Sequence, residues 1–232
     1  MECSWNDVQD DMEGMFPREA EEPVPGTRMT RTRRMTPMFV AKWLYFLVQE
    51  TSFDAMLCEI GTLFGFITAA LGLACLSTNR RVVTVDHMIG GHCMDMRNRK
   101  ACIYLDFIDS MVGLDIWDKI IPIPTKSHPA ASDLISIMDL KFELIYIDGN
   151  HTYDNVLPEL QLYSKFLKPG GIICGDDCNA GQKPFLESFL HNRENFETVP
   201  AVAKAVLEFF IDNDEFEPVE VPVNQFGFRK KL

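Results

Sequence analysis

Two apolar runs that each end in acidic residues constrain this chain most. The first run leads into Asp148, and His151 follows three residues later. The second run leads into the adjacent pair Asp176 and Asp177, and a helix-like stretch separates the two runs. Strands that alternate with helices predict a parallel sheet. Because ligands bind at the carboxyl ends of such strands, we expect the three acids to lie together at a binding edge.

Three carboxylates at one edge favour a hard divalent cation with oxygen ligands, Mg²⁺ or Mn²⁺. Adjacent residues on a regular strand point to opposite faces. Asp176 and Asp177 can therefore reach one metal only if the strand ends at Gly175. His151 has two interpretations, a general base near neutral pH or a residue that merely caps the next helix.

The remaining pattern predicts an α/β fold: a Rossmann-like, mostly parallel seven-stranded sheet with helices on both faces. A hairpin that turns at Asn224 and Gln225 adds antiparallel strands at one edge. The expected strands are 55–60, 81–85, 120–124, 142–147, 172–175, 219–223 and 226–229. The expected helices are 37–50, 66–76, 96–111, 128–137, 155–167 and 202–211.

A glycine cluster follows the first strand. Glu59 lies at the end of that strand, and Gly61 and Gly65 open the next helix. Glycine there permits positive φ and a close approach of ligand to backbone, although closely packed helices use the same spacing. Asp86 ends the second strand, where a carboxylate binds ribose hydroxyls. The dinucleotide pattern GxGxxG is absent, which argues against an NAD-dependent oxidoreductase.

These motifs resemble those of known enzymes. Residues 59–65, EIGTLFG, resemble the first motif of class I S-adenosylmethionine-dependent methyltransferases, in the form typical of metal-dependent O-methyltransferases related to catechol O-methyltransferase. Residues 148–153, 167–171 and 176–177 resemble the branch of macrocin-type and mycinamicin-type sugar O-methyltransferases. The resemblance covers about residues 36–215.

The resemblance implies a role for each motif. Its residues for S-adenosylmethionine are Glu59, Gly61, Thr62, Gly65, Asp86, Ser127 and Asp148. Its metal ligands are Asp148, Asp176 and Asp177. His151 takes the position of the general base, assisted by Asp148, where the catechol branch has a lysine.

The implied function is a metal-dependent O-methyltransferase that acts on a hydroxyl of a small molecule, a sugar or a natural product. A metal-bound oxygen and a nearby base together make a sugar hydroxyl a usable nucleophile. Two alternatives remain open: an enzyme for catechols or phenols, and a catalytically silent subunit that only binds the cofactor. A homo-oligomer also remains open.

Composition excludes other classes. The formal net charge of −12 argues against broad binding of nucleic acid. The longest apolar stretch, residues 64–76, is too short to span a bilayer, so no membrane partner is expected. Seven cysteines without a CxxC pair, and an acidic N-terminus without a signal sequence, favour the cytoplasm. His87, His92 and Cys93 lack a fourth zinc ligand at a suitable spacing.

One domain is expected, the methyltransferase domain at residues 27–232, preceded by an acidic segment at residues 1–26. This segment carries eight acids against one arginine, with three prolines. Such a composition predicts a mobile arm, or a lid if its few apolar residues fold over the site. The short basic run that ends at Arg34 is interpreted as a solvated segment or a loop that faces substrate.

Overall fold

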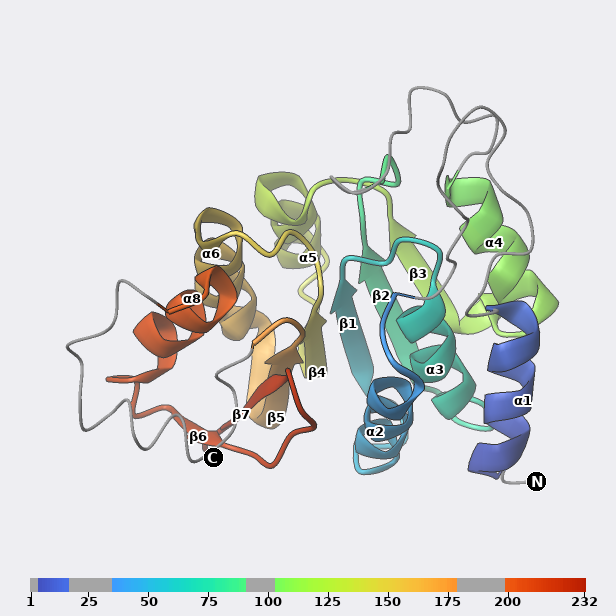
Figure 1. Cartoon of the computed structure of the whole chain (residues 1–232), viewed down its shortest axis with the longest axis horizontal. Helices are drawn as coiled ribbons and strands as arrows, with labels where there is room; N and C mark the ends of the chain where they lie inside the picture. Colours follow the sequence, from blue (N-terminus) through green and yellow to red (C-terminus); the bar gives the residue numbers. More distant parts are fainter. Residues whose placement is uncertain (1–3, 17–34, 91–102, 179–198) are drawn as a thin grey trace. The chain divides into compact units, whose positions relative to one another are not determined.

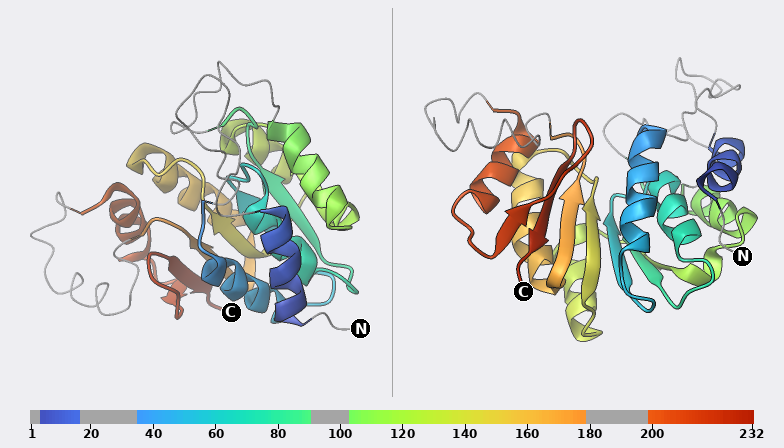
Figure 2. Two further views of the ribbon diagram at one scale, coloured as in Figure 1. Left: turned by 45° about the vertical axis from the view of Figure 1, so that its right-hand side comes forward. Right: turned by 90° about the horizontal axis from the view of Figure 1, so that it is seen from below.

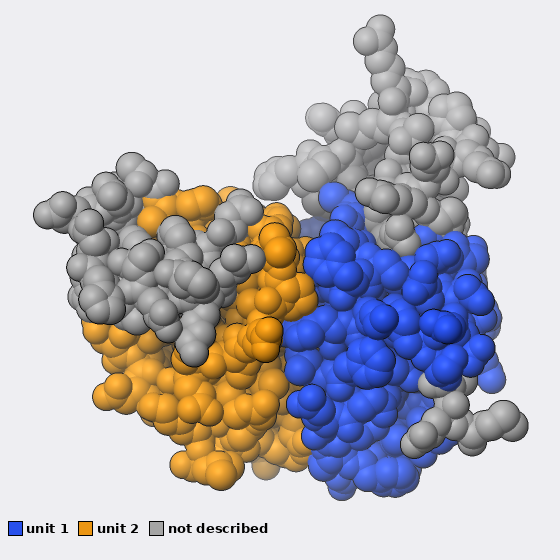
Figure 3. Space-filling model, turned by 60° about the horizontal axis from the view of Figure 1, so that its bottom comes forward, with its two compact units in different colours: residues 1–55, 62–125 blue, residues 56–61, 126–232 orange. Residues whose placement is uncertain are grey.

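The computed structural model describes residues 4–16, 35–90, 103–178 and 199–232. The chain divides into two compact units, which Figure 3 colours separately. Unit 1 comprises residues 1–55 and 62–125, and unit 2 comprises residues 56–61 and 126–232. The acid motifs and His151 belong to unit 2, whereas Asp86 belongs to unit 1.

The strands form one seven-stranded sheet with the order β3-β2-β1-β4-β5-β7-β6. The neighbours β1 and β4, β4 and β5, and β2 and β3 are parallel, while β7 is antiparallel to both β5 and β6. The predicted sheet with its antiparallel C-terminal hairpin is therefore confirmed. The strands are β1 (Met56–Ile60), β2 (Arg81–Val85), β3 (Ile120–Ile123), β4 (Phe142–Ile147), β5 (Leu167–Gly175), β6 (Phe216–Pro218) and β7 (Phe226–Lys230).

Unit 1 is built around an apolar helix. This helix, α3 (Phe66–Ala74), is buried on all sides, packs against β2 and lies beside α2 (Met38–Gln49), as Figure 2 shows. The helix α4 (Ile103–Gly113) and the short 3₁₀ helix η2 (Trp117–Lys119) precede β3. A helix without a polar face needs neighbours on every side, which explains why so many elements surround α3.

The helix α1 (Trp5–Met15) also packs in unit 1. Ser4 and Asp7 form a capping box at its start, and Trp5, Met12 and Phe16 are buried. Phe16 contacts Phe66 of α3 with ring centroids 5.7 Å apart. Residues 5–15 are thus a helix whose apolar stripe is buried in unit 1, while the expectation of a mobile arm or lid over residues 1–26 stays a prediction. Residues 17–34, with the predicted domain boundary and the basic run, lie outside the described residues.

Unit 2 places two helices, α6 (Tyr153–Tyr163) and α8 (Ala201–Phe210), side by side, with α6 also in contact with β4 (Figure 1). The ring of Phe210 stacks on that of Phe228 of β7 with centroids 3.6 Å apart. These contacts fasten the C-terminal hairpin to the unit. The unit's short helices are η3 (Ser127–Ala131), α5 (Ser132–Ile137) and η4 (Ser164–Phe166).

Some element bounds differ from the prediction. The first strand of the hairpin is residues 216–218 and not 219–223, and beyond it Val219 still donates its N–H to the carbonyl oxygen of Gly227. The helix predicted at 96–111 is α4, which the structure describes from Ile103. The helix predicted at 155–167 ends at Tyr163, and β5 begins at Leu167, well before residue 172. Among the described helices, none combines the length and apolarity that crossing a bilayer requires.

Candidate active site

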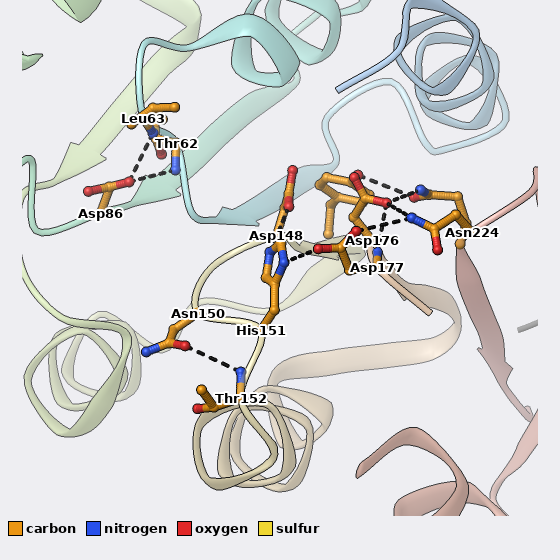
Figure 4. Close-up of polar contacts among 12 residues, drawn as sticks. Thr62, Leu63, Asp86, Asp148, Asn150, His151, Thr152, Asp176, Asp177 and Asn224 are labelled. Atoms are coloured by element: carbon orange, nitrogen blue, oxygen red, sulfur yellow. Dashed lines mark hydrogen bonds and ion pairs between the residues drawn. The ribbon is translucent and has the colours of Figure 1, made fainter. Parts of the chain in front are cut away.

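The loop after β4 carries the first functional group. The N–H of Asp148 donates to the carbonyl oxygen of Ile60 over 2.7 Å, which fixes the start of the loop against the end of β1. His151 lies three residues further on, and Thr152 is the N-cap residue of α6. The imidazole of His151 points toward carboxylates (Figure 4). The alternative that His151 caps the helix is therefore wrong.

The His151 imidazole lies between two carboxylates. Its Nε2 is 3.2 Å from Oδ1 of Asp148, and its Nδ1 contacts Oδ2 of Asp177. The hydrogen bond with Asp148 is the largest cause that raises the pKa of His151 to about 9, against an opposing effect of burial. The ring is therefore protonated at neutral pH in this arrangement, and its charge compensates the two acids.

The acid pair follows the end of β5. The strand ends at Gly175, so Asp176 and Asp177 need not point to opposite faces of the sheet. Asp177 has a left-handed φ of 58°. Both carboxylates reach the same side chain, Asn224, whose Nδ2 is 3.4 Å from Asp176 Oδ1 and 3.0 Å from Asp177 Oδ1. The condition that the strand ends before the acid pair is met, and unit 2 brings the two acids and His151 together (Figure 4).

A buried amide also contacts the acid pair. The side chain of Gln225, which is 1% exposed, donates from Nε2 to Asp176 Oδ1 over 2.5 Å. Its Oε1 accepts from the hydroxyl of Tyr146, a fully buried residue of β4, over 3.2 Å. Burial and the nearby charge of Asp177 raise the pKa of Asp176, while the hydrogen bonds from the Asp177 backbone and Gln225 oppose this.

The donor chemistry of the acids suits a hard divalent cation, since Asp148, Asp176 and Asp177 all offer carboxylate oxygens. Within the described residues, no three His, Cys, Asp or Glu side chains are arranged to hold a metal ion. The imidazolium of His151 already lies between two of the predicted ligands. The acids therefore match a cation in charge and ligand type, but in this arrangement the ring of His151 separates two of the predicted ligands and the acids do not converge on one point.

The loop after β1 carries the predicted cofactor motif. Asp86 holds the part of this motif that belongs to unit 1, which begins at Thr62. One carboxylate oxygen, Oδ2, accepts from the N–H groups of Thr62 and Leu63, each over 2.9 Å (Figure 4). The other, Oδ1, accepts from the N–H of Met88 over 2.6 Å. Asp86 therefore orders two loops. The Thr62 hydroxyl is hydrogen bonded to that of Thr84 on β2.

Both glycines of the motif have backbone conformations that other residues rarely adopt. Gly61 has a φ of 90°, and a Cβ there would collide with the carbonyl oxygen of Asp148. Gly65 has a φ of 89°, and a Cβ there would lie 2.7 Å from the ring of Phe107. Close packing thus explains both glycines. The conformation is also compatible with the predicted approach of a cofactor.

Two further predicted residues lie in unit 2. Glu59 is buried on β1, where it is paired in register with Tyr146. Ser127 is held by α6: its hydroxyl donates to Oε1 of Glu159 over 2.5 Å, and its carbonyl oxygen accepts from the Tyr163 hydroxyl over 2.6 Å. Burial raises the pKa of Glu159 to about 7.

Sequence reasoning missed three of these polar residues. Glu159 lies on the apolar stripe of α6, and an acid there could have been recognised as buried. Asn224 and Gln225 were predicted only as a turn. An antiparallel strand that follows β5 must begin beside the end of β5, so the hairpin register could have placed this turn at the acid pair. His92 and Cys93 of the rejected zinc site lie outside the described residues.

Solved structures share this fold. An O-methyltransferase from Bacillus cereus in complex with SAH has 18% sequence identity and a TM-score of 0.57, covering 95% of this chain and 87% of that one. TomG, an O-methyltransferase from Streptomyces achromogenes involved in tomaymycin synthesis, was solved with SAM and has 13% identity, a TM-score of 0.56 and coverages of 87% and 83%. The SAH-bound methyltransferase PaMTH1 of Podospora anserina has 14% identity, a TM-score of 0.58 and coverages of 97% and 87%.

Sequence comparison gives the family. Among curated proteins, no significant match to the chain is found. A protein-family model described as a methyltransferase domain matches residues 58–178, just over half of the chain. The matched segment runs from the glycine motif through the loop of His151 to the acid pair. The chain belongs to this methyltransferase-domain family.

Proposed function

We propose that this chain is an S-adenosylmethionine-dependent O-methyltransferase that methylates a hydroxyl of a small molecule, with a sugar or a natural product as the acceptor. The family supplies the reaction class, and the solved structures with the same fold include O-methyltransferases with bound SAH or SAM. The resemblance of the motifs to sugar O-methyltransferases supplies the acceptor class.

The contact of His151 with Asp148 and Asp177 carries the proposal. It brings together a titratable ring and two acids from loops that follow different strands, β4 and β5. In open α/β sheets this is the edge at which ligands bind. Perturbed titratable groups gather at functional sites more often than elsewhere, which supports a catalytic role for this cluster.

In the methyl-transfer step itself the protein takes up one proton. The acceptor oxygen attacks the methyl carbon of the sulfonium, a C–O bond forms, and the C–S bond breaks to leave a neutral thioether. The hydroxyl proton passes to a ring nitrogen of His151. In the described arrangement both nitrogens face carboxylates, so His151 must first lose its own proton and exchange one contact for the acceptor hydroxyl. Asp148 and Asp177 then orient the ring.

We propose Asp148, Asp176 and Asp177 as ligands of Mg²⁺, with Mn²⁺ as a substitute. Such an ion, when bound, supplies Lewis acidity that stabilises developing charge on the acceptor oxygen. The carboxylates would hold the cation. Without it, the negative charge of Asp148 and Asp177 holds the ring of His151 beside them. Cation binding and the contact of the imidazolium draw on the same carboxylates, so each should weaken the other.

The cofactor is proposed to contact the residues that sequence reasoning assigned to it, namely Glu59, Gly61, Thr62, Gly65, Asp86, Ser127 and Asp148. The positive φ of Gly61 and Gly65 is compatible with this, although close packing by itself accounts for both glycines. Asp86 supports it indirectly, by ordering the amides of Thr62 and Leu63.

The test is methyl transfer from labelled S-adenosylmethionine to a panel of glycosides and catechols, with Mg²⁺ or with excess chelator. We expect turnover that needs the metal, and loss of turnover in Asp148→Asn and Asp176→Asn. The matched control is Asp154→Asn, since Asp154 is an exposed acid in the first turn of α6. If only catechols are methylated, the acceptor is a catechol and not a sugar. If turnover is complete in excess chelator, the proposed metal requirement is wrong. Cofactor binding without turnover of any acceptor would indicate a silent subunit.

A further inference from the structure

A buried acid of α6 contacts the segment that follows β3. Glu159 is only 3% exposed, although its side chain can ionise. Its Oε1 accepts from the hydroxyl of Ser127 over 2.5 Å. Its Oε2 is also buried and has no hydrogen-bond partner within the described residues. Because a buried polar atom without a partner destabilises the fold, an apolar side chain would pack at this position at lower cost.

The carboxyl of Glu159 also lies beside the loop that carries His151. A Cβ added to Gly149 would be 3.6 Å from Oε1 of Glu159 and 3.9 Å from Oε2. Gly149 follows Asp148 in the loop after β4, and ligands of open α/β sheets bind beside such loops. Ser127, held by the same carboxyl, is therefore close to this edge of unit 2.

The hydrogen bonds of Ser127 decide what its hydroxyl can offer to a ligand. A serine hydroxyl has one proton to donate and two lone pairs that can accept. The proton of Ser127 is directed at Glu159, and the carbonyl oxygen of Ser127 accepts from the buried hydroxyl group of Tyr163 over 2.6 Å. Ser127 itself is only partly buried, so a ligand can reach it. Toward that ligand, the hydroxyl is an acceptor and not a donor.

The base of the proposed cofactor carries a group that suits such an acceptor. The 6-amino group of adenine donates hydrogen bonds, whereas the unsubstituted ring nitrogens accept them. Hypoxanthine, the deaminated base, has a carbonyl oxygen in place of the amino group. That oxygen would face the lone pairs of Ser127 and leave both groups unpaired. A site built to bond one polar group of a ligand rejects an analogue that lacks it.

We propose that Glu159 is a positioning residue that fixes the hydroxyl of Ser127 as an acceptor for the 6-amino group of the cofactor, so that the pair selects adenine over hypoxanthine. This inference rests on the proposed assignment of Ser127 to the cofactor. The buried carboxyl of Glu159 acts through Ser127 and does not itself contact the base. A role in selecting the base explains why a buried acid occupies a position that an apolar residue would fill more stably.

The experiment compares two ligands by calorimetry on the full chain at pH 8. The ligands are S-adenosylhomocysteine and S-inosylhomocysteine, which has an oxygen in place of the 6-amino group. The carboxyl of Glu159, with a pKa of about 7, is ionised at this pH and can only accept. We expect wild type to bind the adenine ligand about 10-fold or more tightly than the hypoxanthine ligand. Ser127→Ala removes the acceptor, and the ratio of the two Kd values should fall about 10-fold.

The variant Glu159→Met tests the positioning role. It keeps an unbranched side chain of similar length and leaves the hydroxyl of Ser127 free to donate as well as to accept. We therefore expect the ratio of the two Kd values to fall in this variant too. If Glu159 acts through Ser127, the double variant should have the same ratio as Ser127→Ala alone. A merely structural role of Glu159 would weaken both ligands equally and leave the ratio unchanged. If Glu159→Met does not fold, Glu159→Leu replaces it.

The matched controls are Ser136→Ala, at an exposed position of α5, and Glu217→Gln, at an exposed position of β6. Both should keep the wild-type ratio. Equal affinity of wild type for the two ligands overturns the inference and leaves the proposed cofactor intact, since Ser127 would then face a group that both ligands share. A ratio retained in Ser127→Ala or in the folded Glu159 variant overturns it as well. A wild type that binds neither ligand overturns it together with the proposed cofactor.

Discussion

The Nε2 atom of His151 lies 3.2 Å from Oδ1 of Asp148, three residues earlier in the same loop. This hydrogen bond is the first cause of the raised pKa of His151, about 9. Asp148→Asn should therefore lower that pKa toward the ordinary value near 6.5. The measurement is an NMR titration of the ring without metal, with Asp154→Asn as a control that leaves it unchanged. An unaltered pKa in Asp148→Asn would show that another group holds the proton.

Removing the ring should reduce turnover. If His151 accepts the proton of the acceptor hydroxyl, His151→Ala should lower kcat by about 10²–10⁴-fold, the usual contribution of a general base. His151→Gln, which can still donate to one carboxylate, should lose as much. Steady-state kinetics on the true acceptor gives kcat. A kcat near the wild-type value in either variant would refute the base assignment.

The carboxylate of Asp86 should support cofactor binding by ordering the loop at Thr62 and Leu63. Hydrogen bonds to a charged group contribute about 1.5–3 kcal/mol, so Asp86→Ala should weaken S-adenosylhomocysteine binding about 10-fold or more. In wild type, the ligand at a hundredfold excess over Kd should stabilise the fold by about 2.7 kcal/mol. Calorimetry and thermal shift measure both effects. Asp109→Ala, an exposed acid of α4, is the control, and an equal loss there would make the effect nonspecific.

The sheet was largely predictable from sequence, because periodicity and apolar runs report which residues are buried. β2 and β4 have the predicted bounds. The hairpin was predicted, but its first strand was misplaced, because the alternation of valines with polar or proline positions over 219–223 resembles a strand more than residues 216–218 do. Sequence does not show that Val219 still donates to Gly227 beyond the end of β6.

The site was predictable as far as strand ends determine it. The sequence placed His151 and the acids at one edge of the sheet, and unit 2 has them in contact. The sequence could not show which side chain each of these groups contacts. Whether His151 contacts Asp177, or Gln225 contacts Asp176, depends on the turn geometry after Gly175 and on the hairpin register, and both are tertiary properties. At residues 5–16, acidic composition alone does not show that Trp5, Met12 and Phe16 are buried.

The helix α1 should contribute to the stability of unit 1, contrary to the behaviour of a mobile arm. Met12 is fully buried in it. Met12→Ala should lower the free energy of unfolding by about 2–5 kcal/mol, the usual cost of a large-to-small change in a core. Denaturant unfolding measures the loss. Glu13→Ala, at the exposed neighbouring position, should change stability little, and equal stability of both variants would mean that α1 detaches in solution.

The buried carboxyl of Glu159 should make stability depend on pH. Burial raises its pKa from 4.5 to about 7, because ionisation without water is costly. Between these values the folded chain retains a proton that the unfolded chain releases, so the group's contribution to stability is full below pH 4.5 and is lost as pH rises to 7. Each pKa unit corresponds to about 1.4 kcal/mol, so the loss is on the order of 3 kcal/mol. Glu159→Gln has no such ionisation and should gain stability relative to wild type over this interval.

Denaturant unfolding at pH 4.5, 5.5, 6.5 and 7.5 gives the difference in unfolding free energy between Glu159→Gln and wild type. We expect that difference to shift in favour of the variant as pH rises and then to stay constant above pH 7. Glu217→Gln, a change at an exposed residue of β6, is the control and should show no such trend. A difference independent of pH would mean that Glu159 is ionised throughout. In that case the hydroxyl of Ser127, 2.5 Å from Oε1, would suffice to stabilise the buried charge.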